Sequence, residues 1–219
     1  MEILRSIFRI GYFNWMLVAA YVILLGVFLY GVLQPRRKSE WRSAGVAQAW
    51  VIALYAEMYG VPLTAYLAMS FLGRSTADAE THFNGHLWPV LMGFEGSGLV
   101  TAQFWFTVVG QALIAVGGLL ALFGWRQIHS AVSEKRMATT GLYRWIRHPQ
   151  YTGFFLFLTG SMINWPTLIT MLTLPVLCFV YWKLAVAEEA DAITVFGDRY
   201  REYMKSTGRF LPRLIPSKS

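Results

Sequence analysis

The amino-acid sequence predicts an all-α, polytopic membrane protein with about five transmembrane helices, among them a C-terminal helical hairpin, and an amphipathic tail helix. Three observations lead to this fold class. Hydrophobic residues make up 56% of the 219 residues and charged residues only 14%, a balance unlike that of soluble domains. Several uncharged runs exceed the roughly 20 residues that a helix needs to cross a bilayer core. Lys and Arg gather in alternate segments between these runs.

The first predicted helix lies in the uncharged run 10–35. Arg5 and Arg9 precede this run, as basic residues precede the apolar part of a secretory signal. The run is too long for such a signal, and no clear small-residue cleavage site follows it. We therefore predict a retained transmembrane helix.

The second predicted helix lies in the run 44–73, which only Glu57 interrupts. A carboxylate within the bilayer is costly to bury, so Glu57 is a functional candidate. Nearby tyrosines, a neighbouring helix or a water-filled cavity would satisfy it in a purely structural role. The roles of Glu57 and of the 74–97 loop stay open.

The third predicted helix lies in the run 98–125, and a hairpin follows it. The run 151–182 holds 32 residues, too many for one span and too few for two full ones. Asn-Trp-Pro at 164–166 resolves this length, because proline cannot continue a helix but favours the first turn of a new one. We predict a short fourth helix over about 151–163 and a longer fifth helix over about 167–190.

The C-terminal tail has an amphipathic pattern, EEADAITVFGDRYREYMKSTGRF. This pattern predicts a continuation of the fifth helix, a break at Gly197 and a short helix at the cytoplasmic membrane surface. Phe196, Tyr200 and Tyr203 recur at helical spacing, so we expect them to pack in the core or as a lid rather than to contact a ligand.

Loop charge orients the predicted spans. With five helices, 16 of the 19 Lys and Arg residues fall on one side of the membrane, in the 35–43 loop, the 126–150 loop and the part from Lys183 onward. The positive-inside rule makes this side cytoplasmic and places the N-terminus outside. Contact with anionic lipid headgroups accounts for the net charge of +7, so we predict membrane lipids and no nucleic acid as partners.

The segment GLYRWIRHPQYTGFF at 141–155 concentrates polar residues beside the longest uncharged run. At about 1.5 Å per residue, the fourth helix rises roughly 20 Å, and the fifth descends more than about 30 Å by Glu188. We therefore expect Glu188 and Glu189 to face the 141–150 segment rather than the body of the fourth helix. Two carboxylates and an Arg-His-Pro turn would then meet at one cytoplasmic membrane edge.

The two ends of this hairpin carry the motifs of a known family. GLYRWIRHPQYTG resembles the Gly-x-Tyr, Arg-His-Pro-x-Tyr-x-Gly motif of the integral-membrane methyltransferases related to isoprenylcysteine carboxyl methyltransferase and the phospholipid N-methyltransferases. EEADAITVFGDRYREY resembles their Glu-Glu, Phe-Gly-x-x-Tyr-x-x-Tyr motif. The resemblance covers roughly residues 113–212, and two ordered motifs are more specific than either alone.

The resemblance implies an enzyme that uses S-adenosylmethionine. This cofactor has a carboxylate, an ammonium, ribose hydroxyls, an adenine and a sulfonium, so its pocket needs cations or backbone donors, acceptors and aromatic faces. Methyl transfer is an in-line displacement that needs alignment and exclusion of water more than a strong base.

The candidate site residues lie at the two ends of the hairpin. The candidates for cofactor binding are Tyr143, Arg147, His148, Pro149, Tyr151, Gly153, Glu188 and Glu189. Arg147 and His148 would donate hydrogen bonds to the cofactor, and the two glutamates would accept them. The two tyrosines would provide aromatic faces, and the glycine would let the backbone approach the cofactor closely. The proline would open the fourth helix. The catalytic candidates are Arg147, Glu188 and Lys183, although Lys183 would equally well extend to lipid headgroups. Taken singly, these side chains are also explained as headgroup anchors, a hydrogen-bonded interfacial histidine or a solvated helix end.

The resemblance most directly suggests an isoprenylcysteine-type carboxylate as the methyl acceptor. A lipophilic or lipidated acceptor would enter sideways from the bilayer, and phospholipid amines and small thiols are alternatives. We predict a single membrane domain, 1–219, because no repeat or long linker divides it. Within it, 1–100 would hold acceptor specificity and 101–219 the cofactor-binding core. The oligomeric state stays open.

Two other classes of function compete with methyl transfer. Membrane sterol-type reductases have a similar Tyr-x-x-x-Arg-His-Pro-x-Tyr-x-Gly turn and use NADPH, but more often show Glu-Arg where this chain has Glu188-Glu189. The small size of the chain also favours methyl transfer. A non-catalytic membrane scaffold or carrier that keeps the fold is the third hypothesis.

Other motifs predict no further site. His82 and His86 have i, i+4 spacing, but a glycine lies between them and no third ligand is evident, so no metal is expected. Gly-Ser-Gly at 96–98 is a lone glycine signature on the predicted outer side. Cys178 is the only cysteine, which excludes an internal disulfide or a thiolate metal cluster.

Overall fold

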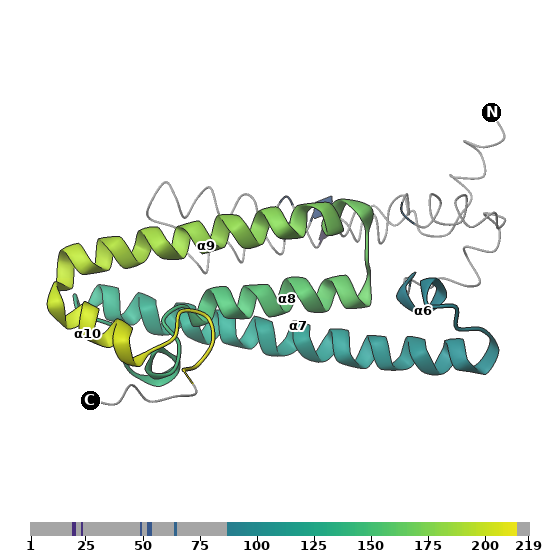
Figure 1. Ribbon diagram of the computed structural model, residues 1–219, viewed down its shortest axis with the longest axis horizontal. Helices are drawn as coiled ribbons and strands as arrows, with labels where there is room; N and C mark the ends of the chain where they lie inside the picture. The colour runs from purple at the N-terminus through teal and green to yellow at the C-terminus, as the bar shows by residue number, and fades with distance from the viewer. Residues whose placement is uncertain are drawn as a thin grey trace. The chain divides into compact units, whose positions relative to one another are not determined.

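The computed structural model describes residues 87–213 and seven helical residues of the preceding part, Ala19, Ala20, Ile23, Ala49, Ile52, Ala53 and Thr64. The described residues contain helices α6 (Leu87–Leu91), α7 (Gly96–Ser133), α8 (Pro149–Asn164), α9 (Leu168–Phe196) and α10 (Asp198–Ser206), and the short 3-10 helix η2 (Gly141–Arg144) (Figure 1). They form no strand, only an isolated bridge between Ile146 and Gly208. The predicted all-α class is confirmed for this part of the chain.

The first two predicted helices and Glu57, His82 and His86 lie outside the described residues, apart from the seven helical positions. The chain divides into two compact units, residues 1–111 with 161–177 and residues 112–160 with 178–219. The predicted single membrane domain, 1–219, stays a prediction.

Helix α7 is longer than the sequence predicted. The run 98–125 lies within it, but the helix continues to Ser133, so the connecting segment begins at 134 instead of 126. Polar residues after the uncharged run do not break a helix, and α7 ends only at Ser133, two residues before Lys135, whose φ is +52°. The backbone N–H groups of residues 134–136 there bond to carbonyl oxygens of residues 130–132, which satisfies the helix end.

The predicted break between the fourth and fifth helices is confirmed. Helix α8 begins at Pro149 and ends at Asn164, and α9 begins at Leu168. Thr167 precedes α9 as a cap, since its hydroxyl accepts the Thr170 N–H at 3.1 Å while the Thr170 hydroxyl accepts the Thr167 N–H at 3.2 Å. Such reciprocal capping stabilises a helix start.

Two described helices are long and apolar enough to cross a membrane, Gly96–Ser133 and Thr170–Phe196. Helix α8 has 16 residues, fewer than the roughly 20 of a full span. The count of five spans and the membrane orientation stay predictions. Helix α10 follows Gly197, whose φ is +60°, in the segment predicted for the tail helix; its place at a membrane surface is likewise untested.

In the second unit, α8 packs against α7 through glycines. A Cβ added to Gly153 would lie 2.4 Å from the Ala121 nitrogen, and one added to Gly117 would lie 2.5 Å from the Gly153 oxygen. Small residues at a helix contact let the two backbones approach closely. The close approach at Gly153 is therefore between two helices, which accounts for this glycine without a cofactor. This contact fixes the first turns of α8, which carry the Arg-His-Pro turn.

Candidate active site

Helices α8 and α9 run antiparallel in the second unit and bring the two sequence motifs together. The Tyr181 ring on α9 lies 4.6 Å from the Phe154 ring and 5.4 Å from the Tyr151 ring. Two turns further along α9, Glu188 Oε1 accepts a hydrogen bond of 2.5 Å from the Tyr151 hydroxyl. The expectation that Glu188 and Glu189 face the 141–150 segment rather than the body of the fourth helix is confirmed, because Glu189 contacts Arg147 and Glu188 lies next to His148.

Glu189 is the centre of a buried charge cluster. Its side chain is 4% exposed and accepts hydrogen bonds from Arg147 Nε at 2.8 Å and from Arg209 Nη2 at 2.7 Å. His148 Nε2 lies 3.3 Å from the same carboxylate. A buried carboxylate is tolerated only when it is paired and hydrogen-bonded, and these three partners meet that requirement. The cluster therefore fixes the position of each member.

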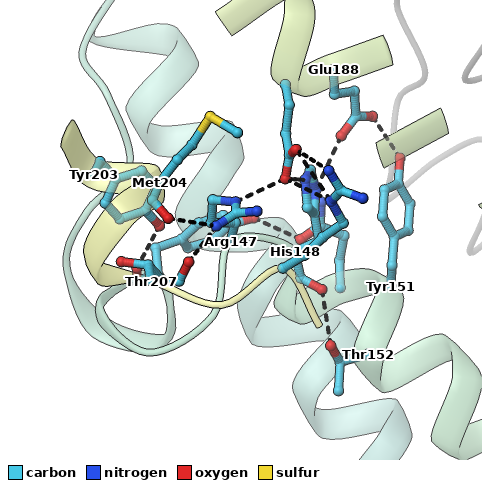
Figure 2. A network of polar contacts seen from close by, with 12 residues as sticks. Arg147, His148, Tyr151, Thr152, Glu188, Tyr203, Met204 and Thr207 are labelled. Atoms are coloured by element: carbon cyan, nitrogen blue, oxygen red, sulfur yellow. Dashed lines mark hydrogen bonds and ion pairs between the residues drawn. The ribbon is translucent and has the colours of Figure 1, made fainter. Parts of the chain in front are cut away.

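Arg147 uses its guanidinium within the protein. Beyond Glu189, its Nη1 donates to the backbone oxygen of Met204 at 3.2 Å and to that of Thr207. Figure 2 shows the side chain directed toward both oxygens, and Arg147 as a whole is only 8% exposed. The structure thus gives Arg147 the geometry of a clamp on the C-terminal segment.

The segment 204–210 is tied to the Arg-His-Pro turn by its main chain as well. The Arg147 N–H donates to the Gly208 oxygen at 2.8 Å. One turn into α8, the Thr152 hydroxyl donates to the Phe210 oxygen at 2.7 Å (Figure 2). Side-chain and main-chain bonds thus join residues about 60 positions apart, so the site depends on a segment that follows α10.

His148 lies between the two glutamates. Its Nε2 faces Glu189, and its Nδ1 lies 3.5 Å from Glu188 Oε2 and is buried without a hydrogen bond. A neutral imidazole has one acceptor nitrogen, which would face a carboxylate, whereas the imidazolium donates from both nitrogens. Burial by itself would lower the pKa of His148, but the adjacent negative charges of Glu188 and Glu189 raise it overall. The site therefore favours protonated His148.

Glu188 lies at the more open edge of the site, next to the buried Tyr151. The Glu188 side chain is 32% exposed, in contrast to that of Glu189. The Tyr151 ring stacks on the His148 ring at 5.5 Å and 18°. A carboxylate, a buried imidazole nitrogen without a hydrogen bond and an aromatic face are thus adjacent, which is the donor and acceptor set expected for a ligand.

Tyr143 and the tail tyrosines support the site from inside. The buried Tyr143 hydroxyl donates to Gln150 Oε1 at 2.8 Å, and burial holds its pKa well above the usual value. Its backbone oxygen accepts the Tyr203 hydroxyl at 2.5 Å, and the Tyr200 and Tyr203 rings lie 5.7 Å apart. Burial likewise raises the pKa of Tyr200 to about 12. Tyr200 and Tyr203 pack as the sequence predicted.

Lys183 does not join the cluster. Its Nζ lies 5.1 Å from the centre of the Phe179 ring, one turn earlier on α9, and the residue is exposed. Five residues of helix separate it from Glu188, which corresponds to a rotation of about 140° around the axis. The catalytic role predicted for Lys183 has no support in this geometry. Pro149 is fully buried at the first position of α8, where the sequence places it.

Arg209 is the site residue that the sequence analysis missed. It donates to both oxygens of Glu189, and this pairing raises its pKa. A signal was present, because a buried glutamate needs strong partners and Arg209 lies only six residues after the second motif. The aromatic pattern of the tail gave no sign that the chain turns back after α10.

Comparison with known proteins identifies the region that forms this site. The isoprenylcysteine carboxyl methyltransferase family matches residues 103–194. This segment, which is less than half of the chain, is therefore similar to that family. The match contains α8, most of α9 and both glutamates, but ends before Arg209.

Curated proteins that are similar to this chain are named as methyltransferases. A methanethiol S-methyltransferase of Pseudomonas deceptionensis is 33% identical over 129 residues, covering 54% of this chain and 47% of the relative. The protein-S-isoprenylcysteine O-methyltransferase of Schizosaccharomyces pombe is 24% identical over 222 residues, covering 97% and 92%. The human protein of the same name is 32% identical over 126 residues, covering 49% and 42%.

The chain spans about half the length of the Pseudomonas and human relatives and most of the fission yeast relative. No solved structure matches it significantly. The relatives' names share methyl transfer but differ in the acceptor. The two long apolar helices and the similarity to this family together indicate an integral membrane protein.

Proposed function

We propose that this protein is an integral-membrane methyltransferase that uses S-adenosylmethionine and modifies a lipophilic acceptor. The observation that carries the proposal is the buried Glu189 cluster, which holds His148 and Glu188 beside Tyr151 in a segment of the methyltransferase family. Buried ion pairs add little to stability, because the cost of removing both charges from water offsets most of their attraction. Stability alone therefore does not explain why this cluster is present. Preorganisation of a ligand site supplies an explanation.

The residues at the open edge suit S-adenosylmethionine. When bound, this cofactor supplies a methyl group activated by the adjacent sulfonium. The partly exposed Glu188 would accept hydrogen bonds from ribose hydroxyls or the ammonium, and protonated His148 would donate from Nδ1. The Tyr151 ring was predicted to supply an aromatic face, but it is buried against the His148 and Tyr181 rings. Its link to the open edge is the hydrogen bond of its hydroxyl to Glu188.

Arg147, Arg209 and Glu189 then act as positioning residues. Arg147 was predicted as a cofactor donor, but its contacts with Glu189 and two backbone oxygens favour a role in holding the site. Fixed polar groups of this kind need no reorganisation during reaction, which is their advantage over water. A closed C-terminal segment would also exclude water from the reacting methyl group.

The acceptor we favour is an isoprenylcysteine-type carboxylate that enters from the bilayer. The family match and the fission yeast relative, which covers most of both chains, support this choice. A small thiol is the second candidate, because the Pseudomonas relative is named for methanethiol. Phospholipid amines remain an alternative within the same fold, whereas the NADPH reductase and scaffold hypotheses lose weight against the family match.

The test is cofactor binding followed by transfer. Detergent-purified protein is titrated with S-adenosylmethionine and separately with NADPH, and then incubated with methyl-labelled cofactor and either an S-farnesylcysteine or methanethiol. We expect S-adenosylmethionine binding and label on the farnesylated acid as a base-labile ester. Binding of NADPH without S-adenosylmethionine would refute methyl transfer. Label on methanethiol alone would keep the enzyme class and replace the acceptor.

A matched pair of variants connects that test to the site. Glu188→Gln removes the open carboxylate, while Glu202→Gln removes an exposed carboxylate on α10 that pairs only with Lys205. We expect Glu188→Gln to weaken S-adenosylmethionine binding at least tenfold, because a charge-assisted hydrogen bond contributes about 1.5–3 kcal/mol. Glu202→Gln should bind normally. Equal binding by both variants would remove Glu188 from the site.

A further inference from the structure

A cavity with both polar and apolar walls lies at the C-terminal end of α7, in the second unit. Its volume is about 490 Å³, within the usual range of ligand pockets. Helix α7 contributes one wall, and the segment 136–140 contributes the other. The residues of α7 that line it are Phe123, Arg126, Gln127 and Ser130. None of its lining residues belongs to the Glu189 cluster.

The α7 wall changes from apolar to polar over two turns. Its residues are spaced i, i+3, i+4 and i+7, so they share one face of the helix. Phe123 is half-exposed and lies within the uncharged run, and Arg126 is the first charged residue after that run. In a membrane helix this transition is the depth at which acyl chains give way to headgroups.

The cavity has one unpaired positive charge. Arg126 is exposed and forms no ion pair or hydrogen bond with the described residues. Arg136, on the opposite wall, is paired with Glu134. With the Arg136 and Glu134 charges offsetting each other, Arg126 leaves a net charge of +1.

The end of α7 does not cancel this charge. Free carbonyl oxygens at a helix C-terminus repel anions, but here backbone N–H groups of residues 134–136 occupy those of residues 130–132. Gln127 also lines the cavity; its Oε1 accepts the Leu142 N–H at 3.0 Å, so the NH₂ group is the donor of this side chain that a ligand could use. Thr140 adds a hydroxyl from the other wall.

We infer that this cavity binds the phosphate of an anionic membrane phospholipid, with Arg126 as its counter-ion, Gln127 and Thr140 as donors and Phe123 against the start of an acyl chain. A phosphodiester carries one negative charge, which matches the net charge of the cavity. Inorganic phosphate carries a larger negative charge at neutral pH and has no apolar part that could contact the apolar wall. The inference rests on the membrane setting and is independent of the methyl-transfer reaction.

The experiment measures lipid retention by native mass spectrometry of the full chain purified in detergent. Wild type, Arg126→Gln and Arg144→Gln are each incubated with phosphatidylglycerol or phosphatidylcholine. Arg144 is the matched control, because it is an exposed arginine of the same unit that stacks on Trp145 and does not line the cavity. A second arm adds millimolar inorganic phosphate as a competitor.

We expect one phosphatidylglycerol per chain on wild type and on Arg144→Gln, and about tenfold less on Arg126→Gln, as for the loss of one charge-assisted contact. Arg126→Lys should restore part of the retention, which separates charge from folding. Equal retention by Arg126→Gln and Arg144→Gln would overturn the inference. Equal retention of phosphatidylcholine, or displacement of the lipid by inorganic phosphate, would also overturn it, the latter in favour of a soluble phosphate ligand.

Discussion

Two arginines of the same compact unit, Arg147 and Arg126, have opposite surroundings. Arg147 is 8% exposed and bonds to Glu189 and two backbone oxygens, whereas Arg126 is exposed and has no ion pair with the described residues. A buried cation must have its donors satisfied inside the protein, while an exposed one is available to an external anion. The charge cluster around Glu189 therefore serves to hold the site in place, whereas the α7 cavity presents its arginine to molecules outside the protein.

The largest effect expected from this comparison is that of Glu189→Ala. This change leaves two arginines and a histidine without their shared counter-charge, and breaking a buried ion pair costs about 3–5 kcal/mol. We expect the apparent melting temperature of the detergent-purified protein to fall by about 10 °C. S-adenosylmethionine binding should be lost as well.

Glu189→Gln controls for shape. The amide keeps the size of the side chain and one acceptor oxygen but removes the charge, so its melting temperature should lie between those of wild type and Glu189→Ala. If Glu189→Ala melted like wild type, the three contacts would not be holding the site together, and this interpretation of the cluster would be wrong.

The second prediction compares the two arginines directly. Arg147→Gln removes the contacts to Glu189, Met204 and Thr207, and we expect a loss of about 2–3 kcal/mol of stability with weaker cofactor binding. Arg126→Gln should change stability by no more than about 0.5 kcal/mol, because it removes an exposed charge. Thermal unfolding of both variants at one ionic strength measures the difference. Similar losses would mean that burial does not distinguish them.

Much of the fold in the described part was predictable from the sequence, because length and proline placement constrain helices strongly. The hairpin break at 164–166 and the helix start at Pro149 were located within a few residues. The end of α7 was placed eight residues too early, at Trp125, because the charge of Arg126 ends the apolar run but does not end the helix. As a result, the sequence did not indicate that Arg126, Gln127 and Ser130 lie on one helix and line a cavity.

The site was predictable as a meeting of motifs but not as a set of roles. Helix lengths correctly brought Glu188 and Glu189 to the Arg-His-Pro turn. Sequence alone could not show that Arg147 would donate hydrogen bonds to backbone oxygens. Nor could it show that the chain after α10 would place Arg209 beside Glu189. Such contacts depend on the path of the chain between elements, which composition and periodicity do not encode.

The third prediction tests the helix contact beneath both regions. Helix α7 forms the cavity wall and α8 carries the Arg-His-Pro turn, and they meet at Gly153. A Cβ there would lie 2.4 Å from the Ala121 nitrogen, so Gly153→Ala should cost about 1–3 kcal/mol and separate the helices.

Gly118→Ala is the matched control, since a Cβ at Gly118 on α7 meets nothing within 4 Å. Its melting temperature should equal or slightly exceed that of wild type, because alanine favours helix over glycine. We expect Gly153→Ala to weaken both S-adenosylmethionine binding and phosphatidylglycerol retention. Loss of only one of these would show that the helix contact supports the two regions separately.

The smallest effect concerns pH and separates the regions by their titration. The pKa of His148 is raised above its ordinary value of 6.5 by Glu188 and Glu189, which outweigh burial. A raised folded-state pKa means that the stability from the imidazolium is fully present below about pH 6.5 and is lost as pH rises through the folded-state pKa. We expect the apparent melting temperature to decline between pH 6.5 and pH 9.

His148→Gln should flatten this decline, since the amide has no proton to lose while Arg147 and Arg209 keep their charge over the whole range. Arg126→Gln should keep the wild-type slope, because no described histidine lines the α7 cavity. An unchanged slope in His148→Gln would mean that another group titrates and that His148 is not held as an imidazolium. A flattened slope would identify the Glu189 cluster, and not the α7 cavity, as the pH-sensitive region of this unit.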